Sequence, residues 1–532
     1  MKKFEIAIFY IFLAALLIAL SFACCSINSD LWARLLQGEA VLQTGHVLTQ
    51  DPFSYVDRHV WIDHEWGSGV VFAIILNAFG YGGLIVFKAF LIFAIFFFII
   101  QTLKLQEVKS TKLYNFLFFF LVINSAETLL LSGIRCHLFT FLFFTFFIYI
   151  LELVRKRGKD KLLILLPFLM IFWANVHGGC VSGIGLLFIY AIGEFFNKKP
   201  CKHYLLTLLG CVAAMFINPY GFDYIKFLFM ATTMQRNMIA EWQNIFEIGS
   251  FELIKAKIFY ILAIITAVYS FFSNKKNGIK FDYTKILLLV TTCYLAVSHL
   301  KHSPFFIITA TIFLYDKFFE LFNGGVGSVR NLLKLNSEIF LKKFVFVKET
   351  GVYIFVFLGI ASVLYLNHES VSARSLKEYP VKIVEFMKIN DLKGNILNNF
   401  GIGSYISYKL YPQNLIYMDG RYEEVYYDST TEDNWNFFNA EKNWDLIFKK
   451  YGLPEYIIVN KNDGIFPVLS DFPLYKNSFK DNSYNLFIRV DLARKEFIQP
   501  KNDEKYYIKT YFDKMFKYNE EIVINGQKVQ FK

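Results

Sequence analysis

Residues 81–103 read YGGLIVFKAFLIFAIFFFIIQTL, a run dominated by apolar side chains. A run of about 20 apolar residues is long enough to cross the hydrocarbon core of a membrane as one helix. The whole chain has the same character, since 55% of its 532 residues are hydrophobic and only 19% are charged. This composition excludes a soluble protein and predicts a polytopic membrane protein.

Apolar runs recur through the first 366 residues and predict about eleven membrane-spanning helices, with one large loop at residues 28–68. The run at 162–175 is short for a span. The predicted spans lie near residues 4–27, 81–103, 113–131, 136–154, 162–175, 180–196, 203–217, 252–272, 283–298, 304–319 and 344–366.

Lysine and arginine clusters occur at every second loop, and they set the expected orientation because these residues resist translocation. One threading puts all six clusters in the cytoplasm. The N-terminus is then inside, and the loop 28–68 and the C-terminal region are outside. The clusters are Lys2 and Lys3; Lys104, Lys109 and Lys112; Arg155, Lys156, Arg157, Lys159 and Lys161; Lys198, Lys199 and Lys202; Lys275, Lys276 and Lys280; and Arg330, Lys334, Lys342 and Lys343.

The net charge of +11 lies entirely in the membrane half, because residues 367–532 carry 23 basic and 23 acidic side chains. Membrane topology and anionic lipid headgroups account for such an excess. We therefore expect a lipid membrane as a partner and no nucleic acid.

Residues 367–532 alternate between helical and extended patterns and predict a C-terminal soluble α/β domain that is exported. Beyond residue 473 the pattern indicates strands and a hairpin, with a turn at Asn482 and Ser483. The elements expected before it are helices at Pro380–Ile389, Ser404–Tyr411 and Asn443–Tyr451, and strands at Gly394–Asn399, Leu415–Met418 and Tyr456–Val459.

The motif Asp419-Gly420-Arg421 follows one of these strands, at a position where α/β domains often bind ligands. A structural explanation is equally available. In that case the motif is a β-turn, in which Gly420 has a positive φ and the Asp/Arg pair braces the chain.

Ser29-Asp30 begins a predicted amphipathic helix that we expect to lie along the membrane interface. Asp30 and Arg34 are four residues apart and can pair on one face of it. The alternative interpretation is that Asp30 only caps the helix.

The loop continues with Trp61-Ile62-Asp63-His64-Glu65-Trp66. In an extended chain Asp63 and Glu65 point the same way, and the flanking tryptophans favour the headgroup level. The alternative here is an interfacial loop with solvated acids.

Further polar side chains lie at the outer ends of predicted helices, where a charge is costly unless it is paired or used. Each one alone has a structural explanation as turn chemistry, whereas their convergence on one face indicates a site. Carboxylates facing cations suit a reaction with a general base and an anionic leaving group. These side chains are Arg135, His177, Asn218, Glu241, Lys301 and His302.

These motifs together resemble the GT-C superfamily, the multi-spanning membrane glycosyltransferases that use polyprenyl-phosphate sugars. The resemblance spans most of the chain, although each motif alone is short. It rests on Asp30-Leu31-Trp32, Asp51-Pro52-Phe53-Ser54, His64-Glu65-Trp66, Arg135, Asn175-Val176-His177-Gly178-Gly179, Asn218-Pro219-Tyr220-Gly221, Glu241-Trp242 and Asp419-Gly420-Arg421.

The resemblance implies sugar transfer from a polyprenyl-phosphate donor to a glycan, lipid or protein acceptor. The reaction would take place at the outer face of a bacterial inner membrane, with the N-terminus cytoplasmic and the C-terminal domain periplasmic. Asp30 would be the base, with Asp63 and Glu65 as further catalytic carboxylates. The residues implied for substrate and phosphate binding are Arg135, His64, His177, Lys301, His302 and Glu241.

Related proteins often carry an aspartate two residues before the base, where this chain has Asn28. A divalent cation, Mg²⁺ or Mn²⁺, would therefore need Glu65 or Asp63 as a ligand.

Two other functions compete with this one. A transporter or flippase for a lipid-linked or anionic substrate needs polar groups near the bilayer midplane and broken helices in paired halves. The sequence has few midplane charges and no similarity between halves. A non-catalytic membrane scaffold, whose exported domain binds a partner, is favoured by Asn28 in place of an acid.

Overall fold

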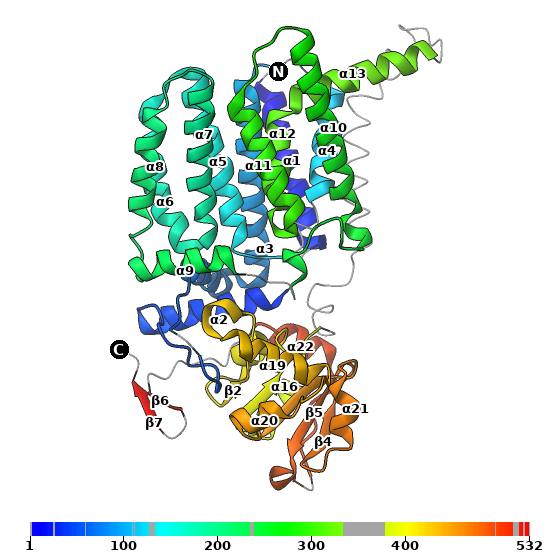
Figure 1. The fold of residues 1–532 in the computed structure, drawn as a ribbon. Helices are drawn as coiled ribbons and strands as arrows, with labels where there is room; N and C mark the ends of the chain where they lie inside the picture. Colours follow the sequence, from blue (N-terminus) through cyan, green and yellow to red (C-terminus); the bar gives the residue numbers. More distant parts are fainter. Residues whose placement is uncertain are drawn as a thin grey trace.

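The computed structural model describes residues 3–24, 27–58, 60–108, 110, 112–126, 133–234, 239–332, 378–494, 496–513, 521–524 and 527–530. Its helices form a bundle, and a sheet with covering helices lies at one end of it (Figure 1). The N-terminus lies at the other end of the bundle (Figure 1). The predicted span 344–366 and the predicted boundary at residue 367 lie outside the described residues.

The bundle consists mainly of helices that are apolar around most of their surface, as expected in lipid. Four helical segments are long and apolar enough to cross a membrane by length and composition, namely Trp66–Leu105, His137–Arg157, Gly178–Phe196 and Ile254–Lys276. The count of about eleven spans stays a prediction. The helices are α1 (Lys3–Cys24), α3 (Trp66–Leu105), α4 (Lys112–Ala126), α5 (His137–Arg157), α6 (Leu165–Val176), α7 (Val181–Phe196), α8 (Lys202–Ala214), α9 (Phe222–Thr233), α10 (Ile254–Lys276), α11 (Tyr283–Ser298), α12 (Ser303–Phe313) and α13 (Tyr315–Leu332).

Two predicted spans differ from the helices observed. α3 begins at Trp66 rather than near residue 81, and it is interrupted at Gly80, which has φ 65° and ψ −169°. Glycine adopts such a conformation without steric cost, so the two parts meet at a kink. The predicted span 304–319 is divided as well, because α12 ends at Phe313 and α13 begins at Tyr315.

The sheet has five strands in the order β2-β1-β3-β5-β4. β1 pairs in parallel with β2 and β3, and β5 is antiparallel to β3 and β4. Ile396 in β1 lies opposite Ile416 and Tyr456, and all three side chains are buried. The elements are α16 (Val381–Ile389), β1 (Gly394–Asn398), α17 (Gly403–Leu410), β2 (Asn414–Ile416), α18 (Tyr422–Val425), α19 (Asp428–Phe438), α20 (Leu446–Tyr451), β3 (Tyr456–Asn460), α21 (Ile465–Ser470), β4 (Tyr475–Lys480), β5 (Tyr484–Arg489) and α22 (Glu504–Thr510), followed by the separate pair β6 (Glu521–Ile524) and β7 (Gln527–Gln530).

The alternating α/β pattern is confirmed here, because every helix and strand predicted between residues 380 and 459 is present with bounds shifted by a few residues at most. The β4–β5 hairpin turns at Asn482 and Ser483 as predicted. The sequence missed α18 and α19, which follow the Asp-Gly-Arg motif.

α2 (Ser29–Thr44) lies between the bundle and the sheet (Figure 1). Every residue from Leu31 to Ala40 is buried, because α3 packs on one side of the helix and α17 on another. The polar side expected for this helix, with Arg34, Gln37 and Glu39, is therefore covered by the protein. The placement of α2 along the membrane interface stays a prediction. Trp61 is buried as well, and its Nε1 donates to Glu424 at 2.9 Å. Its expected depth at the headgroup level stays a prediction.

The loop after α2 joins the edge of the sheet. The N–H of Tyr55 donates to the carbonyl of Ile416 at 3.1 Å, and the N–H of Ile416 donates to Phe53 at 3.0 Å. Nearby, the fully buried Arg421 contacts Asp51 at 2.7 Å and Asp419 at 2.9 Å. Buried charges need partners of this kind, so these contacts hold the C-terminal part on the loop.

The predicted Asp/Arg bracing of the Asp-Gly-Arg turn is present, with Asp51 as an additional partner. The predicted positive φ at Gly420 is wrong, since this residue is not among the described glycines with such a conformation.

α2 and α3 cross at very short range through two glycines. A methyl group on Gly38 would lie 2.0 Å from the carbonyl oxygen of Gly69, and one on Gly69 would lie 2.7 Å from the carbonyl oxygen of Arg34. Small residues of this kind let two helix backbones touch. They place Asp30 and Arg34 close to the bundle.

We expect Gly38→Ala to destabilise the protein by about 1–3 kcal/mol, because the new methyl group collides with backbone. Gly82→Ala is the matched control within α3, where a methyl group meets nothing within 4 Å. The thermal midpoint of the purified protein should fall for the first variant only. Equal midpoints for both variants would contradict the close crossing.

Candidate functional site

The first turn of α2 presents Asp30 without using it as a cap. The N-cap is Asn28, whose side-chain oxygen accepts the N–H of Leu31 at 3.1 Å. Asparagine is among the preferred residues at this position. The interpretation of Asp30 as the helix cap is therefore wrong, and its carboxylate is available for other contacts.

Asp30 contacts Arg135, which lies just before α5. Oδ2 of Asp30 is 2.5 Å from a terminal nitrogen of Arg135, and the same guanidinium donates to both carboxylate oxygens of Glu241. The side chains of Asp30, Arg135 and Glu241 remain 32%, 25% and 41% exposed. The predicted pairing of Asp30 with Arg34 is wrong, because Arg34 makes its ion pairs elsewhere.

The two carboxylates that share Arg135 differ in their affinity for a proton. Burial raises the pKa of Asp30, and the charge of Arg135 only partly opposes this effect. At Glu241 the balance is reversed, and Arg135 lowers the pKa against the effect of burial. Glu241 is thus the firmly ionised partner, and Asp30 is the carboxylate better suited to accept a proton.

The Asp-Gly-Arg turn borders Asp30. A methyl group on Gly420 would lie 3.8 Å from Oδ1 of Asp30 and 3.6 Å from Oγ of Ser29. The neighbouring Arg421 has no exposed surface and is held by two aspartates. The turn therefore offers its backbone to the surroundings of Asp30, whereas the Arg421 side chain cannot reach a ligand.

Arg34 forms a second ionic cluster on the buried side of α2. Its guanidinium lies 2.9 Å from Asp63, 3.1 Å from Glu65 and 2.9 Å from Glu424. Asp63 and Glu65 share this partner, although the chain forms a turn at His64 and Glu65 rather than the extended stretch on which their predicted common direction depended. Glu424 also accepts hydrogen bonds from Gln37 and Trp61.

Three buried carboxylates around one guanidinium leave an excess of negative charge. Against the effect of burial, Arg34 lowers the pKa of Glu65 and of Glu424. Burial prevails at Asp63 and raises its pKa. His64 faces Glu424 at 3.1 Å and Glu65 at 3.5 Å, and it reduces the excess when protonated.

His177 extends this cluster as a neutral hydrogen-bond donor. Its Nδ1 accepts the N–H of Gly179 at 2.8 Å and lies 2.8 Å from the hydroxyl of Thr140. Burial lowers the pKa of His177 to about 4. The single proton of the neutral ring is therefore on Nε2, which lies 3.2 Å from Glu65.

Potential metal ligands come together in two groups of described residues: Glu65, Cys136 and His177, and His64, Glu65 and Glu424. Mg²⁺ and Mn²⁺ prefer sets of oxygen ligands, whereas each group contains nitrogen or sulfur. Asp63 belongs to neither group, so its expected role as a ligand does not fit.

Zn²⁺ accepts mixed ligands of this kind, but the hydrogen bonds oppose it. In the first group the proton on Nε2 of His177 occupies the atom that a metal needs. In the second group Arg34 already holds both Glu65 and Glu424. Neither group fits a metal ion in this arrangement, and the mechanism below uses none.

Lys301 and His302 lie beside Trp242, the residue that follows Glu241. The ammonium of Lys301 is 3.4 Å from the ring centroid of Trp242, and the ring of His302 is 5.8 Å from that of Trp242. Burial lowers the pKa of His302 to about 3. Of the predicted phosphate-binding cations, Arg135 and Lys301 carry charge at neutral pH, and His302 does not.

The structure thus brings the predicted residues into two adjoining clusters, one around Arg135 and one around Arg34. Sequence reasoning missed Glu424 and Cys136. Glu424 is separated from Arg34 by 390 residues, and its local sequence Tyr-Glu-Glu-Val carries no ligand motif. Cys136 directly follows Arg135, and only the adjacency could have drawn attention to it.

No protein-family model matches the sequence, and no curated protein matches it. Among solved structures, the chain is similar to ArnT from Cupriavidus metallidurans, crystallised with undecaprenyl phosphate, with a TM-score of 0.52 and 11% identity over 91% of this chain and 98% of ArnT. It is also similar to the oligosaccharyltransferase of Archaeoglobus fulgidus, crystallised with a tethered acceptor peptide, with a TM-score of 0.52 and 10% identity over 86% of this chain and 69% of that one. At such low identity the likeness concerns the fold, and the chain has a GT-C-like membrane fold.

Proposed function

We propose that this protein is an integral-membrane glycosyltransferase. It transfers a sugar from a polyprenyl-phosphate donor to an acceptor hydroxyl at the outer face of the membrane. The observation that carries the proposal is the partly exposed ion pair of Asp30 and Arg135. In this pair a carboxylate of raised pKa contacts a guanidinium. The similar folds of two proteins whose structures include a polyprenyl phosphate or an acceptor peptide support it.

In this mechanism Asp30 is the base. The acceptor oxygen forms a bond to the anomeric carbon while the bond from that carbon to the phosphate oxygen breaks. The acceptor proton passes to Asp30, and the electron pair of the broken bond leaves on the lipid phosphate. Arg135 lies within reach of both changes in charge, and a fixed cation stabilises a departing oxyanion.

The shared guanidinium couples these two events. When Asp30 takes up the proton, it loses the charge that attracts Arg135. Glu241 keeps Arg135 in place through two hydrogen bonds, one of them from the same nitrogen that contacts Asp30. The other N–H of that nitrogen, released by Asp30, becomes available to the phosphate. Lys301, over Trp242, adds a second positive charge near Glu241.

Arg34 and Glu424 are positioning residues in this proposal. They fix the loop that carries Asp63, His64 and Glu65 against α2. Within the described part of the chain, neither forms a hydrogen bond or an ion pair with Asp30. The C-terminal part is then needed for the geometry of the site as well as for any acceptor contact. Asp63 and Glu65, predicted as catalytic, take the same structural role because Arg34 holds both.

Transport of a lipid-linked substrate is the second candidate, and one observation favours it. Lys88 is fully buried within α3, and ionisable side chains inside membrane helices often serve transport. Movement of a labelled polyprenyl-phosphate sugar across vesicles, with no product formed, would support this candidate.

We expect Asp30→Asn to lower sugar transfer at least about a hundredfold, because the base is lost. The measurement is mass spectrometry of surface glycans from cells that lack the gene and carry either variant at equal membrane levels. Asn28→Asp is the matched control, since it keeps a good N-cap and should restore the glycan. Full restoration by Asp30→Asn would overturn the role of Asp30.

The pH dependence of sugar transfer should follow the protonation of Asp30. Because burial raises the pKa of Asp30, the rate is lost as the pH falls through that raised value and the base becomes protonated. Purified protein assayed with a polyprenyl-phosphate sugar gives this profile, and a rate independent of acidification would contradict the assignment.

We expect Arg34→Gln to lower stability by about 3–5 kcal/mol, because three buried carboxylates lose their only guanidinium. Glu424→Gln should cost much less, because it removes part of the negative excess. The double variant should therefore be more stable than Arg34→Gln alone. Thermal midpoints of the three variants test this order, and simple additivity of the two losses would rule out the cluster.

A further inference from the structure

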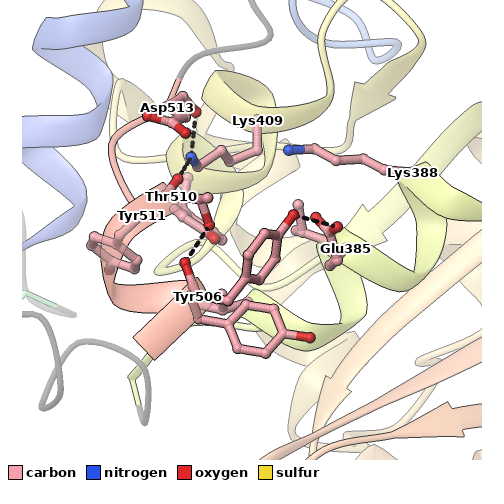
Figure 2. A pocket seen from close by; sticks show the side chains of 11 residues that line it. Glu385, Lys388, Lys409, Tyr506, Thr510, Tyr511 and Asp513 are labelled. Carbon is pink, nitrogen blue, oxygen red and sulfur yellow. Dashed lines mark hydrogen bonds between the residues drawn. The ribbon is translucent and has the colours of Figure 1, made fainter. Parts of the chain in front are cut away.

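A separate hollow lies in the C-terminal part, between α16, α17 and α22 (Figure 2). Its volume is about 250 Å³. None of its lining residues belongs to the clusters around Arg135 and Arg34. Lysines and tyrosines form much of its lining, and Val381 and Val384 also line it. This volume is small for a ligand site and suits a group the size of one sugar unit.

Lys409 lies at the inner wall and is 3% exposed. Its ammonium donates to the carbonyl oxygen of Thr510 at 3.0 Å and to that of Asp513 (Figure 2). An ammonium has three donors, so one remains for a ligand. Burial and the neighbouring Lys388 lower the pKa of Lys409 to about 7.

Lys388 extends into the same hollow from α16 (Figure 2). It makes no hydrogen bond or ion pair with any residue that the structure describes. Glu385, one turn earlier on α16, instead accepts the hydroxyl of Tyr506 at 3.0 Å. Asp513, the other acid of the lining, is exposed at the rim. Burial lowers the pKa of Lys388 although both acids oppose it.

The hollow places two partly desolvated ammonium groups, of Lys388 and Lys409, beside aromatic rings, and this combination favours a particular class of ligand. A desolvated cation without a partner gains most from an anion. Tyrosine rings offer apolar faces and hydroxyls, and the Glu385 carboxylate can accept a hydrogen bond from a sugar hydroxyl. We propose that this hollow binds a sugar unit that carries a carboxylate or phosphate group, with the anion at Lys388 and Lys409.

The walls of the hollow connect it to α2. Tyr405 and Tyr511 line it, and their rings pack on Trp32 with centroid distances of 5.1 Å and 5.3 Å. Trp32 lies two residues after Asp30. An acidic sugar in the hollow is therefore held one aromatic layer from the helix of the candidate base. This position next to α2 assigns the sugar unit to the acceptor. The assignment rests on the proposed function, whereas the binding of the sugar does not.

Binding titrations of the full-length protein in lipid nanodiscs test the proposal. The probes are glucuronate, glucose 6-phosphate, glucose and inorganic phosphate. We expect both anionic sugars to bind at least about tenfold more tightly than glucose, as a charge-assisted contact requires. Inorganic phosphate should bind more weakly than either of them, because it lacks the ring that contacts the tyrosines.

Lys388→Gln should weaken binding of both anionic sugars about tenfold without loss of folding, since Lys388 has no hydrogen bond to lose. Lys476→Gln, at an exposed position on β4, is the matched control and should change nothing.

Binding should also weaken as the pH rises from about 6 to 8.5, because Lys409 loses its proton near its pKa of about 7 beside Lys388, Glu385 and Asp513. The charge of Lys409 contributes fully to binding of the anionic sugar only below that pKa.

Unchanged binding by Lys388→Gln, or glucose binding as tightly as the anionic sugars, would overturn the proposal. Inorganic phosphate binding as tightly as glucose 6-phosphate would overturn the sugar assignment and leave a plain anion site. Asp30→Asn should bind the probes like the wild type. If that variant also keeps full transfer activity, the proposed function fails while the sugar site stands.

Discussion

The structure depends on the buried guanidinium of Arg34. Its side chain is 6% exposed and lies among three carboxylates from two distant parts of the chain, Asp63 and Glu65 in the loop after α2 and Glu424 in the C-terminal part. A charge in such a place is stable only with partners close by, so α2, the loop after it and the C-terminal part must come together or leave it unpaired. His64 faces Glu65 and Glu424 in this cluster, and burial raises the pKa of Asp63. Arg34 thus holds the loop after α2 and the C-terminal part against α2.

This constraint makes the C-terminal part a component of the site. The pair of Glu424 with Arg34 and the pair of Arg421 with Asp51 attach it to α2 and to the loop after α2, and the Gly420 backbone comes to lie beside Asp30. An attachment through buried charges is directional, because each guanidinium nitrogen needs its own acceptor. The orientation of the C-terminal part over Asp30 is therefore defined more closely than apolar packing alone would define it.

The sequence predicted those features that local pattern controls. Apolar runs located most helices of the bundle, and alternation of element types located the strands around Ile396. Helical spacing, in contrast, shows only that Asp30 and Arg34 can share a face, and the structure gives each of them a different partner. The pairing of Arg34 with Glu424 spans 390 residues, so no local pattern could reveal it. The same long-range contact covers the polar side of α2, and the helical pattern alone could not show what covers it.

The two ends of α5 each carry an arginine paired with acids, and the two arginines differ in their access to solvent. Arg155, in its last turn, contacts Glu152, Glu194 and Asp282, and the exposed fractions are 3% for Arg155 and 1%, 3% and 28% for the acids. Arg135, just before its first turn, lies about 30 Å away along a helix of 21 residues and keeps a quarter of its side chain exposed. Both arginines satisfy the rule that buried charges are paired. Only the pair of Arg135 with Asp30 combines access for a substrate with a carboxylate whose pKa burial has raised, and proton transfer requires both. The chemistry of the chain is therefore expected at the end of α5 that faces α2.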